Sequence, residues 1–285
     1  MTRWTIGSGD TDMIEHFNIT SIGYSHIKAD KVCQDHSLSY FDGERTIITA
    51  CDGHGGDVYI RSHKGSKFAS LATLRAMLDA ESLSFRKYTA EEIEHNLKLN
   101  ILCEWNRLVR EDLAEHPIRK SEVAHLTEVQ IESIKQNPTK AYGSTLGGTM
   151  LYGNRLICVG LGDGGCFLIR NGDITPAFPE DEDEPVANIT YSLCGEKAFE
   201  HMNARIFDMR GLDGVLLCTD GVLGPYQSTE NFKRSFVRPV VRRIIDGKTN
   251  EVKEFVCDLG LRSGIGDDVS LAMILKDTTK PRFYR

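Results

Sequence analysis

The stretch Thr46-Ile47-Ile48-Thr49-Ala50-Cys51-Asp52-Gly53-His54-Gly55-Gly56 decides how the rest of the chain is interpreted. Its first six residues are mostly β-branched or small and apolar, which predicts a buried strand. A carboxylate at the end of that strand, followed by glycines, favours a sharp turn that leaves peptide carbonyls reachable. Such a turn suits a hard cation, which takes oxygen ligands from Asp and from backbone carbonyls. Asp-Gly is also a common turn dipeptide, so a plain turn with a solvated Asp52 and His54 stays open as the alternative.

The composition is that of a soluble globular protein. The chain has 285 residues, of which 40% are hydrophobic and 26% charged, and we expect a single domain over 1–285. The net charge of −7 argues against nucleic acid as a partner. No apolar run approaches the roughly 20 residues of a membrane span, and the first residues do not resemble a secretion signal. We therefore expect a cytoplasmic protein that does not bind membranes.

The eight cysteines predict a reduced compartment. None of them forms a Cys-x-x-Cys pair, and several lie inside apolar runs, where they behave as small hydrophobic residues. Eight cysteines in a chain of this length are too sparse for a disulfide scaffold. Cys51 and His54 have the spacing of half a zinc site, but no second pair matches it.

The order of expected elements indicates an α+β fold. The expected strands are 17–24, 33–40, 45–51, 143–152, 155–160, 166–170, 204–209, 214–219 and 268–275. The expected helices are about 58–78, from 89 to a stop at Pro117, 121–136, 228–246 and 250–261. Residues 117–140 would form a helical insertion and 280–285 a loose tail.

Strands and helices arrive in blocks rather than in strict alternation, which is typical of α+β proteins. We therefore predict two antiparallel β-sheets packed as a sandwich and flanked by α-helices, in four αββα layers. Tight turns between the strands of 143–170 predict an antiparallel meander. The acidic run 180–184 is expected to be a solvated loop, with a bias toward basic substrate sequences as the alternative.

Four carboxylates share one local context, because each stands at the edge of an apolar strand and beside glycine. They are Asp52, Asp163, Asp220 and Asp267. A carboxylate beside a buried strand is costly unless it is paired or binds a cation. Four of them suggest strand ends that converge on one cation cluster, since like charges at close range repel one another. An all-oxygen site suits Mg²⁺ or Mn²⁺ better than Zn²⁺, and two such ions can stabilise an in-line displacement at phosphorus.

The same residues carry a resemblance to a known family. Asp-Gly-His-Gly-Gly at 52–56 is followed in order by four shorter motifs: Gly143-Ser144-Thr145, Gly162-Asp163, Asp220-Gly221 and Asp267-Asp268-Val269-Ser270. This ordered set resembles the metal-dependent protein phosphatases of the protein phosphatase 2C family. It spans about 23–275, and Ser25-His26 with Cys33-Gln34-Asp35 looks like a bacterial branch of the family.

The resemblance implies a set of metal ligands. Asp52 would bridge two Mn²⁺ or Mg²⁺ ions, and Gly53 would add its backbone carbonyl. Asp220 and Asp267 would complete the shell of the first ion. Asp163 resembles the ligand of a third, weaker ion.

Further roles follow from the same resemblance. Gln34 and Asp35 would contact the second ion through water. His54 would act as the general acid that protonates the leaving Ser or Thr oxygen, while a metal-bridging hydroxide attacks the phosphorus. Asp268 is adjacent to Asp267, and the spacing along the strand leaves open which of the two is the ligand.

The chain departs from the family at the phosphate-binding arginine, which would lie four residues before Gln34. Asp30 occupies that position, and a carboxylate repels phosphate. Lys28, Lys31 or His26 could substitute, although lysine lacks the fork geometry of arginine. Gly-Asp-Gly-Gly at 162–165 also replaces the family's Gly-Asp-Ser-Arg.

The sequence therefore predicts a serine/threonine protein phosphatase acting in signalling. Its partner would be a phosphorylated protein, the product of a Ser/Thr kinase, and we expect a monomer. The competing hypothesis is a phosphatase-fold module, weakly active or inactive, that binds phosphoprotein or a regulatory partner. A hydrolase of small phosphoesters is a third possibility.

Overall fold

The computed structural model describes residues 14–79, 81, 83–178, 190–262 and 266–276. Its strands are β1 Ile14–Ser21, β2 His36–Phe41, β3 Arg45–Cys51, β4 Leu146–Tyr152, β5 Arg155–Leu161, β6 Gly165–Arg170, β7 Asp173–Pro176, β8 Asn203–Asp208, β9 Leu212–Cys218 and β10 Val269–Lys276. The predicted acidic loop 180–184 and the tail 280–285 lie outside the described residues.

Helices fill the segments between the strands. The longer ones are α2 Ser62–Leu78, α3 Ala90–Glu115, α4 Glu128–Gln136, α8 Arg238–Ile245 and α9 Thr249–Arg262. The short ones are α1 Tyr24–Lys28, η1 Pro138–Tyr142, α5 Ala198–His201, α6 Asp220–Leu223, α7 Thr229–Phe232 and η2 Lys233–Val237.

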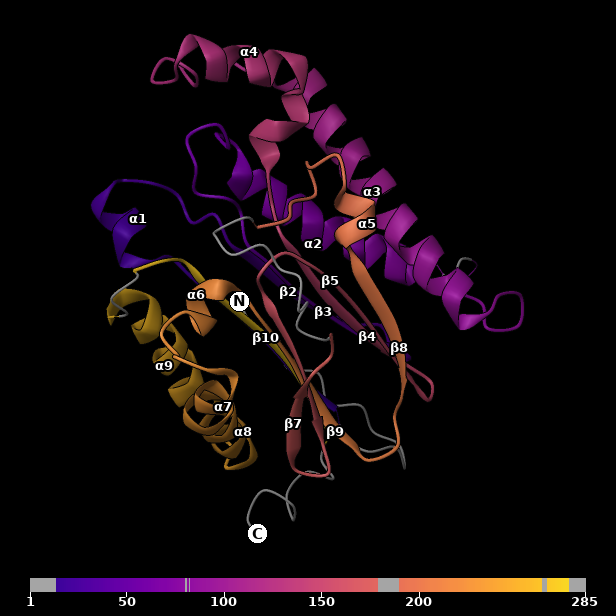
Figure 1. Cartoon of the computed structure of the whole chain (residues 1–285). Helices are drawn as coiled ribbons and strands as arrows, with labels where there is room; N and C mark the ends of the chain where they lie inside the picture. The colour runs from indigo at the N-terminus through magenta and orange to yellow at the C-terminus, as the bar shows by residue number, and fades with distance from the viewer. Residues whose placement is uncertain (1–13, 80, 82, 179–189, 263–265, 277–285) are drawn as a thin grey trace.

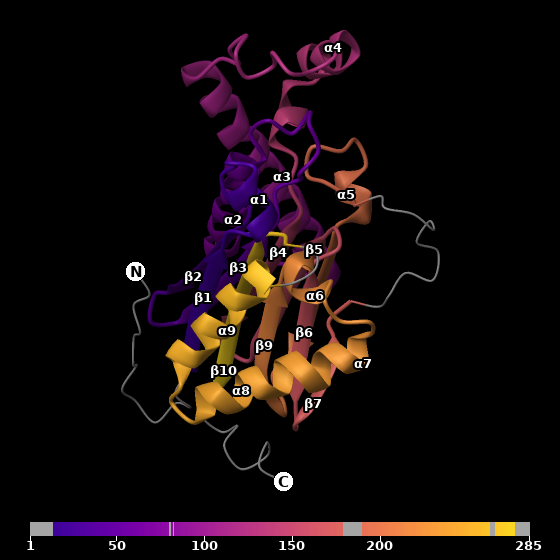
Figure 2. The same ribbon diagram turned by 90° about the vertical axis from the view of Figure 1, so that its left-hand side faces the viewer.

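The strands form two five-stranded antiparallel sheets, which confirms the predicted sandwich. One sheet has the order β1-β10-β9-β6-β7 and the other β2-β3-β4-β5-β8. Helices α2 and α3 cover the outer face of the second sheet, and α8 and α9 cover that of the first (Figure 1). Figure 2 shows α8 and α9 from the front, lying across the strands of their sheet.

Three apolar clusters hold the four layers together. One joins α2 and α3 to the β2–β8 sheet around the buried Trp105, and a second joins α7–α9 to the β1–β7 sheet around Phe232 and Phe236. The third lies between the two sheets. Alternating residues of each strand face opposite layers, so one strand supplies two clusters.

The predicted meander over 143–170 is wrong in its last strand. β4 and β5 pair as a hairpin, but β6 pairs with β9 and β7 in the other sheet. The link between β5 and β6 is the loop that carries Gly162 at φ +97° and Asp163. A tight turn that joins two apolar strands in sequence therefore does not distinguish a hairpin from a crossing between packed sheets.

Element boundaries also differ from the prediction in the N-terminal part. β1 ends at Ser21, because Gly23 and Ser25 donate backbone hydrogen bonds to Asp268 and Gly266 and turn the chain into α1. The predicted helix at 121–136 is shortened to α4, which begins after a capping box formed by Thr127 and Gln130. The helix predicted from 89 is confirmed.

Strand register brings five loops to one end of the sandwich. His36 pairs with Cys51, Leu146 with Leu161, and both Gly165 and Leu271 with Cys218. The ends of β3, β5 and β9 and the starts of β2, β6 and β10 consequently share one edge of the molecule. Every aspartate singled out in the sequence lies in these end segments.

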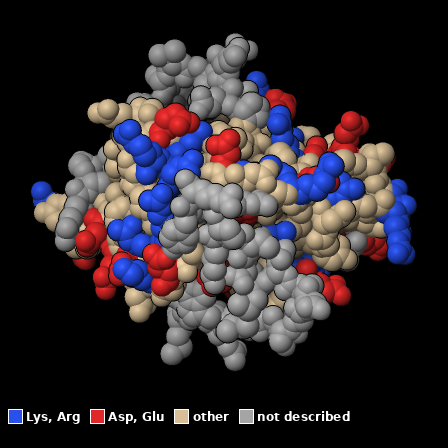
Figure 3. Space-filling model, turned by 90° about the horizontal axis from the view of Figure 1, so that it is seen from below, with Lys and Arg blue, Asp and Glu red and all other residues tan. Residues whose placement is uncertain are grey.

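The opposite end of the sandwich has a mixed surface. In Figure 3, which views the molecule from below, Lys and Arg are interspersed with Asp and Glu around the grey atoms. Within the described part of the chain, no helix combines the length and the apolar character needed to cross a membrane.

Candidate metal centre and active site

Three of the predicted aspartates converge at the common strand end. Asp52 follows β3, Asp163 lies between β5 and β6, and Asp220 begins α6 directly after β9. One carboxylate oxygen from each lies within 4.8 Å of the others. Asp52 and Asp220 are half-buried and Asp163 is exposed. The sandwich thus gathers three carboxylates that are distant in sequence, with Asp52 and Asp220 separated by more than 160 residues.

The turn at Asp52 is fixed by its neighbours rather than by its own side chain. Its backbone N–H donates to Thr145 Oγ1 at 2.9 Å, and its carbonyl accepts from Thr145 N and Ser144 Oγ, each at 2.8 Å. A Cβ at Gly53 would lie 2.6 Å from the backbone oxygens of Gln34 and Ser62. Glycine is therefore required at 53, which explains the Asp-Gly pair at this strand end.

The acidic groups raise one another's pKa values, and burial is the larger cause. Burial, together with the charges of Asp35 and Asp220, holds the pKa of Asp52 well above its usual range. Burial likewise raises the pKa of Asp220 to about 6, with Asp163 and Asp267 contributing. Ionisation of such carboxylates is costly, and a bound cation would remove that cost.

Asp267 and Asp268 have different surroundings. Asp268 is 2% exposed and accepts hydrogen bonds from Gly23 N at 2.7 Å and Gln34 N at 2.6 Å, and its Oδ2 lies 2.8 Å from His26 Nδ1. Asp267 is half-buried, and its charge contributes to the raised pKa of Asp220. Asp268 therefore fastens the N-terminal loop to β10, and together with burial its charge also raises the pKa of Asp35. Asp267 is not among the three carboxylates that lie within 4.8 Å of one another, and its link to them is its charge effect on Asp220.

Gln34 and Asp35 lie between the acidic cluster and α2. Gln34 Nε2 donates to Ser62 Oγ at 2.7 Å, and its Oε1 is buried without a hydrogen-bond partner. Asp35 is buried, its Oδ2 accepts from Thr219 Oγ1 at 2.8 Å, and its Oδ1 has no partner. Burial raises the pKa of Asp35 to about 7, although hydrogen bonds to Asp52 and Thr219 oppose the shift. Gln34 Oε1 and Asp35 Oδ1 are thus two buried oxygens near the carboxylate cluster that lack a hydrogen-bond partner.

His54 lies on the same loop as Asp52, two residues further on. Its ring packs against Tyr59 with centroids 4.9 Å apart, and its backbone N–H donates to Gly143 O at 3.1 Å. Its Nε2 is buried and has no hydrogen-bond partner. Burial lowers the pKa of the imidazole, and the charge of Asp163 acts in the opposite direction. The ring is held in place while one nitrogen is left available.

The three residues predicted to grip phosphate are placed differently from one another. Lys28 at the end of α1 and Lys31 in the following loop are exposed and form no ion pair within the described ranges. His26 is buried and bonded to Asp268, which gives it a structural partner. Asp30, between them, adopts a positive φ of 52°.

Sequence reasoning missed the side chains that hold these loops. Thr219 joins Asp35 to β10, because its Oγ1 donates to Asp35 and accepts from Ser270 N at 2.9 Å. Tyr59 supports the His54 ring, and Thr145 supports Asp52. Thr219 directly precedes the Asp220-Gly221 motif and Thr145 belongs to the Gly143-Ser144-Thr145 motif, so their positions in sequence were an available signal. Tyr59 offered none.

The donors at this end fit divalent cations of the Mg²⁺ type. They are carboxylate, carboxamide and carbonyl oxygens, the ligands preferred by Mg²⁺ and Mn²⁺. Gln34 Oε1 and Asp35 Oδ1 are buried without partners, as expected for oxygens that face an ion or its bound water. We therefore regard the cluster as a candidate metal centre.

Comparisons with known proteins agree with this arrangement. The family model described as protein phosphatase 2C matches residues 22–256. No curated protein sequence matches the chain. A bacterial serine phosphatase has a similar structure, with 16% identity, a TM-score of 0.59 and coverage of 92% of this chain and 97% of the other.

Two further solved structures show the same fold. The catalytic domain of the serine threonine protein phosphatase PstP, in complex with two manganese ions, is 17% identical with a TM-score of 0.56, and 92% of this chain and 98% of that chain are covered. PppA, a regulatory component of the type VI secretion system in Pseudomonas aeruginosa, is 17% identical with a TM-score of 0.58 and coverage of 92% and 97%. With the family match over 22–256, these likenesses establish that the chain belongs to the protein phosphatase 2C family of phosphoprotein phosphatases.

Proposed function

We propose that this chain hydrolyses phosphoserine and phosphothreonine in proteins with the help of Mn²⁺ or Mg²⁺. The observation that carries the proposal is the approach of the Asp52, Asp163 and Asp220 carboxylates to within 4.8 Å, with pKa values of Asp52 and Asp220 raised by burial and mutual repulsion. Metal-assisted phosphoryl transfer uses such a site, because cations offset the charge of the phosphate and of its neighbours.

The proposed ligands are Asp52, the Gly53 carbonyl, Asp220 and Asp267 for a pair of ions, with Asp163 for a third. Gln34 and Asp35 would contact the second ion through water. When bound, the ions supply an acidified water and neutralise the phosphoryl oxygens. The chain's own contribution is to fix the ligand geometry through Thr145 and Thr219.

His54 is the proposed proton donor to the leaving oxygen of serine or threonine. Its Nε2 is buried and without a partner, so a hydrogen bond to an incoming oxygen would satisfy it. Tyr59 and the Gly143 carbonyl hold the ring and its backbone while this happens. A bound phosphate dianion would favour the protonated imidazole, which offsets the lowering of its pKa by burial.

Exposed lysines are the proposed contacts for the substrate phosphate. Lys28 ends α1 and Lys31 lies on the loop that leads from α1 to Gln34. Both lysines carry the positive charge that the family's arginine would supply. His26 is a weaker candidate, because Asp268 already occupies its Nδ1. Asp30 should make this grip weaker than a bidentate arginine would.

The proposed setting is the cytoplasm, with substrates made by a Ser/Thr kinase and a monomeric enzyme. All eight cysteines are free, and four of them are buried. Burial raises the pKa of Cys51 to about 11, so this thiol stays protonated and inert. Free thiols of this kind are typical of a reducing compartment.

The test is hydrolysis of a phosphopeptide with Mn²⁺, comparing wild type with Asp52→Asn and Asp220→Asn. Each substitution should lower kcat/KM by at least about a hundredfold, since even indirect metal contacts commonly cost ten- to a hundredfold. The matched control is Asp173→Asn, an exposed carboxylate at the start of β7, which should retain activity. Equal rates in all four proteins would refute the assignment. Failure to bind millimolar Mn²⁺ in calorimetry would instead support a binding module without turnover.

A further inference from the structure

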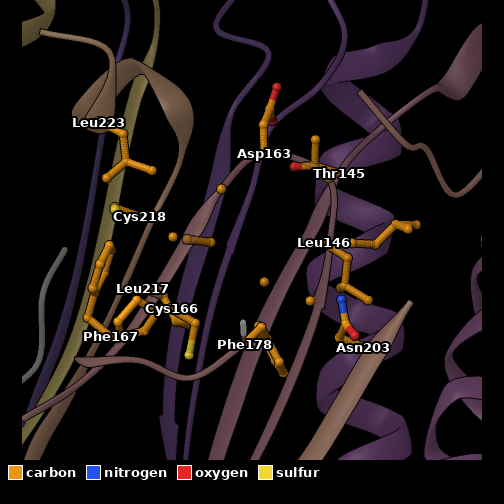
Figure 4. A pocket seen from close by; sticks show the side chains of 18 of the residues that line it. Thr145, Leu146, Asp163, Cys166, Phe167, Phe178, Asn203, Leu217, Cys218 and Leu223 are labelled. Carbon is orange, nitrogen blue, oxygen red and sulfur yellow. The ribbon is translucent and has the colours of Figure 1, made fainter. Parts of the chain in front are cut away.

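A cavity of about 490 Å³ lies at the metal-centre end of the sandwich, and the proposed reaction does not use it. Asp163 and Thr145 lie at one end of this cavity, and Cys166, Leu217 and Phe178 lie toward the other (Figure 4). Ligand sites in proteins commonly have volumes of about 300–1,000 Å³ and mainly apolar walls. The cavity has a volume in this range, and its walls combine apolar side chains with polar ones such as His201 and Asn203.

Two glycines of the inter-sheet core line this cavity. Gly147 on β4 and Gly160 on β5 are direct cross-strand partners. They belong to the alternating positions that face the other sheet, as do Thr149 and Cys158 at the next level. Leu217 of the other sheet lies 3.9 Å from the position that a Cβ at Gly147 would occupy, and Cys166 lines the cavity beside it.

Phe178 covers one side of this space. Its ring lies against Gly160, with Cε2 2.8 Å from the position that a Cβ would occupy. The wall made by Cys166, Leu217 and Phe178 offers no charged group, so a charged ligand entering here would lose its hydration without compensation. The part of the cavity beside these three side chains therefore favours apolar groups of a ligand.

The cavity and the metal centre share a residue. Asp163 belongs to the carboxylate trio within 4.8 Å and also lines the cavity, at the end marked in Figure 4. A phosphate bound at the carboxylate cluster would consequently lie close to the cavity entrance. Because an extended chain advances about 3.3–3.6 Å per residue, a side chain one or two positions from the phosphorylated residue can reach inside.

We propose that this cavity is a substrate subsite for a large apolar side chain, aromatic or branched, that lies one or two residues from the phosphoserine or phosphothreonine. The inference rests on the proposed phosphatase function. It adds a sequence preference, because substrates with an apolar side chain near the phosphorylated residue should be hydrolysed faster. Burial of one such side chain should raise kcat/KM about tenfold to a hundredfold over alanine.

The test uses wild-type protein, Mn²⁺ and phosphopeptides that carry Phe, Leu, Lys or Ala at each position from −2 to +2. At one position, Phe and Leu should exceed Ala by about tenfold or more, and Lys should not exceed Ala. Equal kcat/KM for Phe and Ala at every position would overturn the subsite while leaving the phosphatase function intact. No hydrolysis of any peptide, the Ala series included, would overturn the phosphatase function itself.

A filling variant ties the preference to the cavity. Cys166→Phe should abolish the preference for Phe over Ala while leaving hydrolysis of the Ala peptide within a few-fold of wild type. Cys166→Ser adds no volume and should keep the preference, which makes it the matched control. A folded Cys166→Phe protein, verified by circular dichroism, that still prefers Phe would contradict the proposal. If Cys166→Phe does not fold, the wild-type peptide comparison decides.

Discussion

Two clusters of buried charge in this molecule differ in whether they are balanced. Around Arg61, positive and negative groups alternate: its Nε lies 2.8 Å from Glu122 Oε1, and Lys64 Nζ lies 2.9 Å from Asp112 Oδ1. Tyr142 completes the network through hydrogen bonds to Arg61 and Asp112. The second cluster consists of Asp35, Asp52, Asp163 and Asp220. The charged neighbours that shift the pKa values of Asp35, Asp52 and Asp220 are all acidic.

The pKa values report this difference. The hydrogen bond from Arg61 holds the pKa of Glu122 down at about 2, whereas burial and like charges raise those of Asp35 to about 7 and Asp220 to about 6. A balanced cluster stabilises the fold by itself. An unbalanced one must either take up protons or bind a cation to relieve the repulsion, which is the physical basis for proposing a metal centre.

Breaking the balance at Arg61 should have the largest effect on stability. Arg61→Leu leaves Asp112 and Glu122 without their shared partner in a buried site, since Arg61 is only 4% exposed. The free energy of unfolding should fall by about 3–5 kcal/mol, as measured by urea denaturation. The control is Arg119→Ala, whose side chain is 80% exposed and which should change stability little. Equal stability of Arg61→Leu and wild type would refute this view of the cluster.

The adjacent Asp267 and Asp268 allow the comparison to be made within one strand end. Asp268→Asn loses charge-assisted hydrogen bonds to Gly23, His26 and Gln34, and the free energy of unfolding should fall by about 1.5–3 kcal/mol. Asp267→Asn should instead lower Mn²⁺ affinity about tenfold or more, measured by calorimetry, with little loss of stability in the metal-free protein. The opposite pattern would exchange the roles of the two residues.

Metal removal should make stability depend on pH in a defined direction. Asp220 and Asp35 have pKa values raised in the folded state, so the metal-free fold binds more protons than the unfolded chain. Stability is therefore greatest below about pH 4 with respect to these groups, and is lost as pH rises through about 6 to 7.

The expected loss is about 2 kcal/mol between pH 4 and pH 8 in EDTA, and saturating Mn²⁺ should restore it. Asp220→Asn in EDTA should show a smaller pH dependence and should be more stable than wild type at pH 8. Thermal melts in EDTA at the two pH values measure this. A flat pH profile would show that neither burial nor mutual repulsion raises the pKa values of these carboxylates in the folded protein.

The smallest effect is expected where balanced charges lie in solvent. Glu104 bridges Arg75 and Arg107 on the exposed faces of α2 and α3. Arg107→Gln should leave both the melting temperature and hydrolysis nearly unchanged, because exposed ion pairs are screened by water and salt. A clear loss of stability would mean that burial is not what makes the ion pairs of Arg61 stronger than those of Arg107.

The sequence made the fold class and the acidic strand ends predictable, because both depend on local patterns. The run 45–51 and its Asp-Gly end identify a strand that stops at a turn, and the capping box at Thr89 marks the start of α3. The sequence did not show which sheet contains β6. A loop with glycine at 162 can connect β5 to a hairpin partner or to a strand of the other sheet. Pairing with β9 depends on residues about 50 positions away.

The site shows the same limit. Carboxylates could be named from their strand ends, but choosing between Asp267 and Asp268 requires the hydrogen bonds to Gly23 and Gln34. His26 was a candidate for substrate contact because its partner Asp268 lies 242 residues away. The local sequence pattern therefore predicts which functional group a residue provides. Only the tertiary contacts show whether that group already has a hydrogen-bond partner within the protein.

The position of β10 has a consequence for how the enzyme is made. The strand is last in the chain order but lies between β1 and β9 in its sheet. A nascent polypeptide still lacking 266–276 would carry Asp52, Asp163 and Asp220 yet have a gap inside that sheet and no Asp267. A chain truncated before residue 266 should therefore lack phosphatase activity, although three of the clustered carboxylates would still be present.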